Sequence, residues 1–205
     1  MVRRTKADAL TTKSALLDAA ERLFSSLGVA NTSMMQVAEA AGVTRGAIYH
    51  HFDNKLDLID SLVERVRLPV DEMRDKLAQS YADNPLEQLR LRSMRIVQQV
   101  KYDDHMQALL NILFHKCEYV AETQPIHTRH LQGRNSCIDE CERLILQAMS
   151  QGQVKPDLNA RAVVLGMFGL IDGLMYNWLL DNSYFDIEQV AEQSIDSYLA
   201  GIRLS

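Results

Sequence analysis

Two adjacent histidines lie close to a tyrosine and an arginine in the stretch VTRGAIYHHFDNK, residues 43–55. Such side chains can ligate a metal ion, exchange protons in catalysis, or bind a group outside the protein. Adjacent residues on a helix point about 100° apart, so His50 and His51 cannot easily share one ion. The pattern therefore favours contact with an external partner over a metal site.

A second group of residues with metal-binding potential contains His127, His130, Cys137 and Cys141, in the spacing H-x2-H-x6-C-x3-C. The members of each pair fall about one helical turn apart and could together ligate zinc. The gap between the pairs matches no common zinc spacing, and the chain would have to bend near Gly133 to close a site. We therefore expect no metal site, and no cofactor, in this protein.

Cys117 follows His115 closely, a combination that is found in enzymes with a thiol nucleophile. Neighbouring side chains on a helix diverge, and the sequence contains no glycine loop that would bind an oxyanion. We therefore expect no enzymatic activity.

The composition predicts an all-α fold. Of 205 residues, 47% are apolar and 6% aromatic, with nine glycines and four prolines, and the abundant Leu, Ala, Met, Glu and Gln favour helices. The spacing of apolar residues and caps predicts about nine helices: three in an N-terminal region, a linking fourth, and five behind it. The N-terminus lacks the features of a secretory signal, and three cysteines suit a reducing compartment, so we expect the cytoplasm.

Charge is distributed unevenly along the chain. Residues 1–55 contain seven Lys or Arg and five Asp or Glu, a net charge of +2, whereas the remainder carries fifteen against twenty-two, a net charge of −7. A basic N-terminal region on an acidic body suits a protein whose N-terminal region binds a polyanion.

The first 55 residues predict three helices that surround the histidines. Apolar residues recur at helical spacing over residues 13–27, and a glycine follows. Ser33 and Gln36 form a capping box for a short second helix that stops at Gly42. Thr44 caps a third short helix. Two short helices joined by a glycine turn and supported by a longer first helix are a helix-turn-helix.

The second helix of such a motif lies in the DNA major groove with its first residues against the base edges. Arg45 can bind both acceptors of a guanine, and Gly46 lets the backbone approach the duplex closely. Tyr49, His50 and His51 lie one turn further and suit phosphates or a thymine methyl group. A dimer would present two such helices to a palindromic site in double-stranded DNA.

The run TSMMQVAEAAGVTRGAIYHHFDNKLDLIDSLVERV, with the opening MVRRTKADAL, resembles the DNA-binding domain of TetR-family regulators, specifically the AcrR-like branch that represses multidrug efflux pumps. The stretches NILFHKCE (111–118) and IDGLMYNWLL (171–180) are similar to the ligand-binding domain of that branch. The family often has an aromatic residue where this chain has His50. The resemblance implies that operator DNA is contacted by Ser33, Thr44, Arg45, Gly46, Tyr49, His50, His51 and Lys55.

The resemblance also implies a division into a helix-turn-helix domain, residues 1–55, and a ligand-binding and dimerisation domain, residues 56–205. Its implied function is ligand-responsive repression of a multidrug efflux operon, with release from the operator by lipophilic and often cationic compounds. A regulator of a metabolic or fatty-acid gene with a different inducer is the alternative.

Behind the N-terminal region, a long amphipathic helix begins near Asn54, and we expect Pro69 to break or bend it. The segment 158–180 is apolar on every side, which predicts burial all round, and its polar residues argue against a membrane span. Its three glycines form a low ridge for a neighbouring helix. The closing amphipathic segment, from Ile187 to Ile202, needs a partner, so we predict a homodimer in which two helices of each chain pack together.

An acid in this apolar helix, Asp172, is costly unless it is solvated, paired or used in binding. Residues four apart share a helix face, and three such sets together predict a pocket lined by apolar, aromatic and sulfur-containing side chains. One acid would favour cationic compounds in it. An ordinary core in which Asp172 is paired is the alternative. The predicted pocket residues are Leu110, Phe114, Cys137, Cys141, Phe168, Asp172 and Tyr176.

Overall fold

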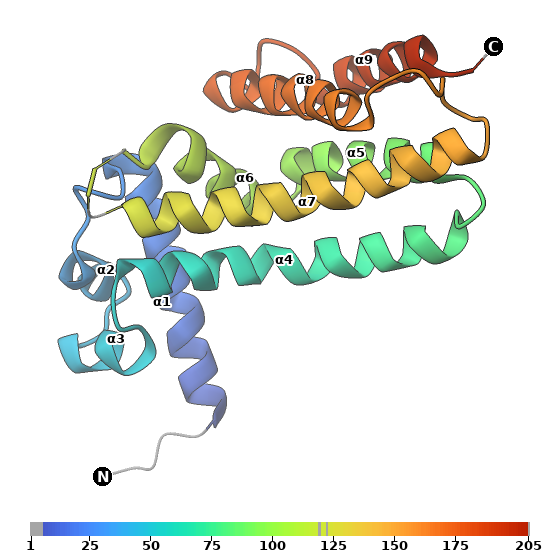
Figure 1. The fold of residues 1–205 in the computed structure, drawn as a ribbon. Coiled ribbons are helices and arrows are strands. Elements are labelled where there is room, and N and C mark those ends of the chain that lie inside the picture. Colours follow the sequence, from blue (N-terminus) through green and yellow to red (C-terminus); the bar gives the residue numbers. More distant parts are fainter. Residues whose placement is uncertain (1–5, 119, 122, 205) are drawn as a thin grey trace. The chain divides into compact units, whose positions relative to one another are not determined.

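The computed structural model describes residues 6–118, 120–121 and 123–204 (Figure 1). Across these residues the chain is helical and has no strand beyond an isolated bridge between Val154 and Arg203. The predicted all-α fold is therefore confirmed. Arg3 and Arg4, which contribute to the predicted basic N-terminal region, lie outside the described residues. The elements in chain order are α1 (Lys6–Leu27), α2 (Met34–Ala40), α3 (Arg45–His51), α4 (Lys55–Ser80), α5 (Pro85–Tyr102), α6 (Asp104–Asn111), the π-helical segment η1 (Ile112–Lys116), α7 (Gln124–Ser150), α8 (Ala160–Leu180) and α9 (Ile187–Ile202).

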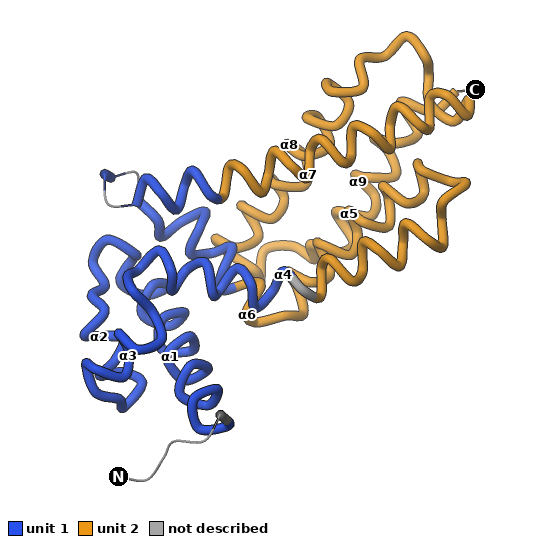
Figure 2. Tube along the Cα trace, turned by 60° about the horizontal axis from the view of Figure 1, so that its bottom comes forward, with its two compact units in different colours: residues 1–67, 108–129 blue, residues 68–107, 130–205 orange. Residues whose placement is uncertain are grey.

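The chain forms two compact units (Figure 2). The first contains residues 1–67 and 108–129, and the second contains residues 68–107 and 130–205. Each of α4, α6 and α7 contributes residues to both units. The compact units are therefore not two consecutive segments, and the division into functional domains at residue 55 stays a prediction.

The first unit holds the predicted helix-turn-helix. Ser33 Oγ accepts a hydrogen bond from Gln36 N while the Gln36 side chain accepts one from Ser33 N, so the predicted capping box is confirmed. Thr44 caps α3 as predicted. Gly28 and Gly42 have positive φ angles of 86° and 67°, which glycine adopts at least cost when it ends a helix. The helix before Gly28 is longer than predicted, because it begins at Lys6.

The fourth helix is not broken at Pro69, so the first of the two expected outcomes was wrong, and a bend at this residue stays a prediction. It continues from Lys55 to Ser80 with the proline inside it. Proline removes one backbone donor, which costs the bond to the carbonyl of Arg65, but the remaining bonds of a helix this long can maintain it. The boundary between the two compact units falls between Arg67 and Leu68, directly before this proline.

In the second unit, α9 packs against α5 and α8. Its apolar stripe is buried within the chain, with Ile187, Ala191 and Ile195 fully inaccessible. Lys101 on α5 also forms an ion pair with Asp186 at the start of α9, at 2.9 Å. The partner that this stripe was expected to need is therefore supplied in this chain by α5 and α8, and the homodimer stays a prediction.

Within one chain α8 is not buried on all sides, so its predicted burial depends on the second copy of the predicted homodimer and stays a prediction. Leu165, Tyr176 and Leu180 are 50%, 44% and 61% exposed, and no described atom lies within 4 Å of a Cβ placed on Gly169 or Gly173. Among the described residues, α8 is the one helix whose length and composition would allow it to cross a membrane, and 33% of that window is buried in the chain. One apolar face of α8 is therefore exposed at Leu165, Gly169, Gly173 and Leu180 in the part of the chain that the structure describes.

Candidate functional site

The face of α3 opposite the core carries the predicted base-reading residues. Ala47 and Ile48 are 8% and 0% exposed and anchor the helix in the first unit. Arg45, Gly46 and Tyr49 are exposed on the other side. The Arg45 guanidinium lies 5.8 Å from the centre of the Tyr49 ring, close enough for a cation–π interaction that holds the arginine at the helix surface. Arginine and tyrosine thus form one outward-facing pair at the start of the helix.

Gly46 has no steric role inside the protein. A Cβ at this position would lie 4.0 Å from Thr44 Oγ1, an ordinary contact, and its φ is not positive. Glycine inside a helix is less favourable than alanine by about 1 kcal/mol. An unobstructed surface at the start of α3 is what close approach of an external backbone requires.

The two histidines lie in different surroundings. His50 is exposed, whereas His51 is half-buried with its ring centre 6.2 Å from that of Phe52. The two imidazole rings meet edge to face, with centres 5.3 Å apart and planes at 69°. His50 is therefore placed to contact an external partner, and His51 packs in part against the core side of the helix.

The remaining predicted DNA contacts differ in availability. Ser33 and Thr44 are exposed, and their hydroxyl oxygens accept capping hydrogen bonds from Gln36 N and Ala47 N. Lys55 Nζ donates to Val29 O at 3.0 Å and to Ala30 O at 3.4 Å. The ammonium group of Lys55 thus supports the loop between α1 and α2, and a phosphate contact would compete with these bonds.

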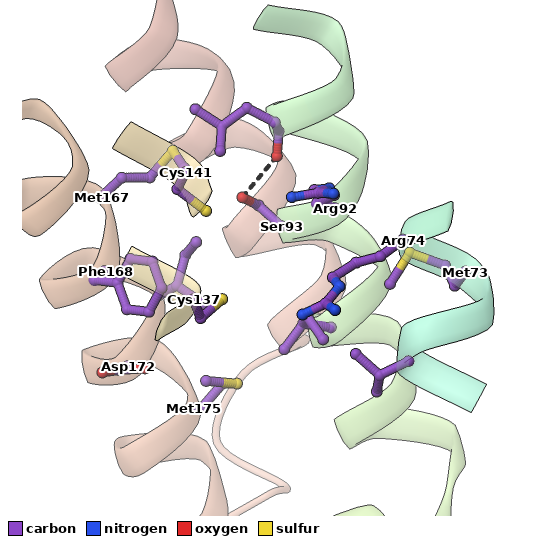
Figure 3. A pocket seen from close by; sticks show the side chains of 14 residues that line it. Met73, Arg74, Arg92, Ser93, Cys137, Cys141, Met167, Phe168, Asp172 and Met175 are labelled. Carbon is purple, nitrogen blue, oxygen red and sulfur yellow. Dashed lines mark hydrogen bonds between the residues drawn. The ribbon is translucent and has the colours of Figure 1, made fainter. Parts of the chain in front are cut away.

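A cavity of about 190 Å³ lies within the second unit, between α4, α5, α7 and α8 (Figure 3). Four of the predicted pocket residues line it: Cys137, Cys141, Phe168 and Asp172. The other lining residues are Val70, Met73, Arg74, Leu89, Arg92, Ser93, Ile96, Met167, Ile171 and Met175. Most of this lining is apolar, as in pockets that bind small lipophilic molecules.

Three predicted pocket residues are not in this lining. Leu110 and Phe114 are half-buried and belong to the first compact unit, whereas the cavity belongs to the second. Tyr176 is 44% exposed. At about 3.6 residues per turn, residues eight apart differ by roughly 80° in direction, so Tyr176 turns away from the face of Phe168. Met175 occupies the equivalent place in the cavity.

Two arginines in the cavity wall, Arg74 and Arg92, were not predicted from the sequence. Arg74 Nη1 and Arg92 Nη1 lie 3.3 and 3.8 Å from Glu140 Oε2, so one carboxylate on α7 bridges arginines from α4 and α5. Arg92 Nε is buried and has no hydrogen-bond partner among the described residues. Apolar periodicity alone gives little signal for such residues, because a long arginine side chain can reach a cavity from the edge of an apolar face.

Asp172 is half-buried and lines the same cavity. Burial raises the pKa of its carboxyl group above the usual value, and the positive charge of Arg134 opposes this shift. The cavity therefore combines an apolar wall, a donor on Arg92 that lacks a protein partner, and one acid whose ionisation is disfavoured by burial.

The alternative zinc site would need ligands that a continuous helix holds apart. The helix α7 runs unbroken from Gln124 to Ser150, through Gly133. At a rise of about 1.5 Å per residue, His130 and Cys141 are roughly 16 Å apart along its axis, too far for one ion. His127 Nε2 instead lies 3.7 Å from Cys117 Sγ.

The thiol of Cys117 is a poor nucleophile. It is 8% exposed, and burial, with a smaller contribution from the charge of Glu118, raises its pKa to about 11. The thiol form therefore predominates at neutral pH, and only the thiolate is strongly nucleophilic. Its proximity to His127 makes a buried polar contact.

Comparison with known proteins extends this description to nearly the whole chain. Residues 16–62 match bacterial regulatory proteins of the tetR family, and residues 84–203 match the C-terminal region of MAATS-type transcriptional repressors. The regulator AcrR of Shigella flexneri is 34% identical over 198 residues, which cover 95% of this chain and 91% of AcrR.

Two solved structures agree with these matches. NalD, the secondary repressor of the MexAB-OprM multidrug efflux pump in Pseudomonas aeruginosa, has a TM-score of 0.86 and 33% identity, over 97% of this chain and 98% of NalD. SmeT, the repressor of a Stenotrophomonas maltophilia multidrug efflux pump, was solved with triclosan and has a TM-score of 0.82 and 25% identity, over 95% and 92% of the two chains. The helix-turn-helix, the helical domain that follows it and both matches lead to one conclusion: the chain belongs to the TetR family of transcriptional regulators.

Proposed function

We propose that this protein is a dimeric repressor of a multidrug efflux operon, released from a palindromic operator when a lipophilic compound occupies its cavity. The observation that carries the proposal is the exposed face of α3, which contains Arg45, Gly46 and Tyr49, while the opposite face of the helix is buried in the protein. Members of the TetR family are DNA-binding repressors and not enzymes, in agreement with the prediction that the chain has no enzymatic activity. Such a protein would act in the cytoplasm, where the DNA is.

The proposed dimer uses the apolar face of α8. This face contains Leu165, Gly169, Gly173, Tyr176 and Leu180. Its two leucines are at least half exposed, and the space beside its two glycines is open in the described chain. A twofold contact places the same face of each copy against the other and buries both. Gly166 is not free for this purpose, because Tyr198 of α9 already occupies the space above it.

The proposed ligands are lipophilic compounds with one polar or cationic group. The cavity is mostly apolar, and polar groups in such a site fix the orientation of a ligand. Arg92 Nε would donate to a carbonyl or hydroxyl oxygen, and Asp172 would accept from a cationic group. SmeT was solved with triclosan, a lipophilic aromatic compound whose polar group is an uncharged hydroxyl.

In this proposal, α4 transmits the effect of ligand binding from the cavity to the DNA-binding helices. Its C-terminal half contributes Val70, Met73 and Arg74 to the cavity wall, and its N-terminal half packs in the unit that carries α3. A ligand shifts an equilibrium only by its difference in affinity for the two conformations. The proposed ligand therefore binds more tightly to the conformation in which the two α3 helices are wrongly spaced for the operator.

Asp172→Asn is expected to weaken binding of a cationic ligand more than that of a matched neutral one. A hydrogen bond to a charged group contributes about 1.5–3 kcal/mol, so the dissociation constant for phenylbutylamine should rise by roughly 10- to 100-fold. The constant for phenylbutanol should change by less than about threefold. Both are measured by calorimetry at neutral pH.

The matched control is Asp157→Asn, which removes an exposed carboxylate outside the cavity. It should leave both dissociation constants unchanged. Equal losses for the amine and the alcohol in Asp172→Asn would contradict a charge role for Asp172.

A further inference from the structure

Two cysteines one helical turn apart on α7 face the cavity. Cys137 is half-buried and Cys141 is 6% exposed, and both are free thiols. Figure 3 shows Cys137 beside Phe168 and Cys141 beside Met167, on the side of the cavity opposite Arg74 and Arg92. An apolar cavity with two thiols can bind a lipophilic compound and also hold it against a nucleophile.

The surroundings of the pair favour a thiolate at Cys137. A hydrogen bond from the Cys141 thiol lowers the pKa of Cys137, and the positive charges of Arg74 and Arg92 lower it further, whereas burial and the charge of Glu140 oppose this shift. The same hydrogen bond, together with burial, raises the pKa of Cys141. Asp172 on α8 is the carboxylic acid among the lining residues, to which Glu140 does not belong. Cys137 is also the less buried of the two thiols, so its sulfur is the one more open to a compound in the cavity.

Helix geometry argues against a disulfide between the two sulfurs. Residues four apart on a helix have Cβ atoms about 5–6 Å apart, whereas a disulfide requires about 3.5–4.5 Å. Because α7 is continuous from Gln124 to Ser150, closing that gap would distort the helix. Reaction of a single thiolate with a compound in the cavity requires no such distortion.

We propose that Cys137 is a covalent modification site for lipophilic α,β-unsaturated carbonyl compounds that enter the cavity. That such an adduct releases DNA rests on the proposed function, whereas the modification itself does not. The chemical class of these compounds follows from the lining of the cavity. Its apolar wall suits the carbon skeleton, its guanidinium groups can donate to a carbonyl oxygen, and a sulfur nucleophile lies across the cavity from them.

The reaction is a conjugate addition. The Cys137 sulfur forms a bond to the β-carbon, the π electrons of the C=C bond move to the carbonyl oxygen as an enolate, and the α-carbon then takes one proton from water. No group leaves and no oxidant is needed. The Arg74 and Arg92 guanidinium groups favour the enolate charge as it develops.

The test treats the wild-type protein with N-phenylmaleimide, locates the adduct by peptide mass mapping, and measures release of fluorescent operator DNA in parallel. Cys137 should react at least about tenfold faster than Cys117, whose pKa is raised to about 11 by burial. The adduct should release the operator. N-phenylsuccinimide, which has the same shape without the reactive double bond, should form no adduct.

Two variants separate the roles of the thiols. Cys137→Ser should lose the rapid modification, and Cys141→Ala should slow it and move the rate profile to higher pH, because the hydrogen bond that favours the thiolate is gone. Modification spread equally over the cysteines, or retained at full rate in Cys137→Ser, would overturn the proposal. If Cys137 is modified but the protein binds no operator, the modification site is confirmed and the proposed function is contradicted. If the adduct leaves operator affinity unchanged, the modification has no regulatory role and that part of the proposal is overturned.

Discussion

Replacing Arg45 by alanine is expected to abolish sequence-specific operator binding while the dimer and its helical content stay unchanged. The side chain is exposed, and its contact within the protein is with the neighbouring Tyr49 ring, so the fold does not depend on it. An arginine–guanine pair contributes about 1–3 kcal/mol of discrimination, and a dimer makes it twice, so specific binding should weaken by roughly 2–6 kcal/mol. Fluorescence anisotropy with operator and scrambled duplexes at one salt concentration measures this loss.

The control for Arg45→Ala is Arg143→Ala, which removes an exposed arginine from α7. Both variants lose one positive charge per chain, so a general electrostatic effect would weaken DNA binding in both. If Arg45 reads bases, only Arg45→Ala should lose the difference in affinity between operator and scrambled DNA. Retention of full operator affinity by Arg45→Ala would show that α3 does not read bases.

Replacing Leu165 by glutamate is expected to convert the dimer to a monomer. Leu165 is 50% exposed on the uncovered face of α8. In a twofold interface the two new carboxylates would lie near each other and be desolvated, and both effects disfavour association. Because a palindromic site needs two α3 helices, operator affinity should fall at least about a hundredfold. Light scattering coupled to size-exclusion chromatography measures the mass.

Leu146→Glu is the matched control for the dimer. Leu146 is 52% exposed on α7, so the substitution adds the same charge at a similar exposure but away from α8. A dimer that persists in Leu165→Glu and dissociates in Leu146→Glu would place the interface on α7.

The local signals in the sequence predicted local structure well. The capping box of Ser33 and Gln36, and the cap that Thr44 gives to α3, depend on residues within one turn. All the groups that form these hydrogen bonds lie within a few residues of one another, so the sequence alone is enough to predict the caps. The order of helices and the exposed face of α3 follow from the same kind of signal.

Long-range packing was harder to predict. The apolar stripe of α9 required a partner, but the sequence could not show that α5 and α8 of the same chain supply it. Likewise, counting residues four apart placed Tyr176 with Phe168, although the drift of the helix over two turns turns it outward. The two arginines of the cavity wall lie on α4 and α5, and how these helices pack against each other cannot be predicted from a short stretch of sequence.

Helix breaking at Pro69 also depends on context. A proline lacks one backbone donor, but a long helix can still include it when other contacts hold the helix on both sides. In α4, Arg65 before the proline forms an ion pair with Asp18, and Arg74 after it forms one with Glu140. The same limitation applies to η1, the π-helical turn from Ile112 to Lys116, for which the residues gave no recognisable signal.

The most direct test of sequence-specific DNA binding is a titration of the wild-type protein with the duplex upstream of its own gene and with a scrambled duplex, over a series of salt concentrations. We expect the first duplex to bind at least about a thousandfold more tightly. The affinity for both duplexes should fall as salt rises, because phosphate contacts release counterions. Equal affinity for the two duplexes, or no binding at low salt, would contradict the assignment of α3 as a base-reading helix.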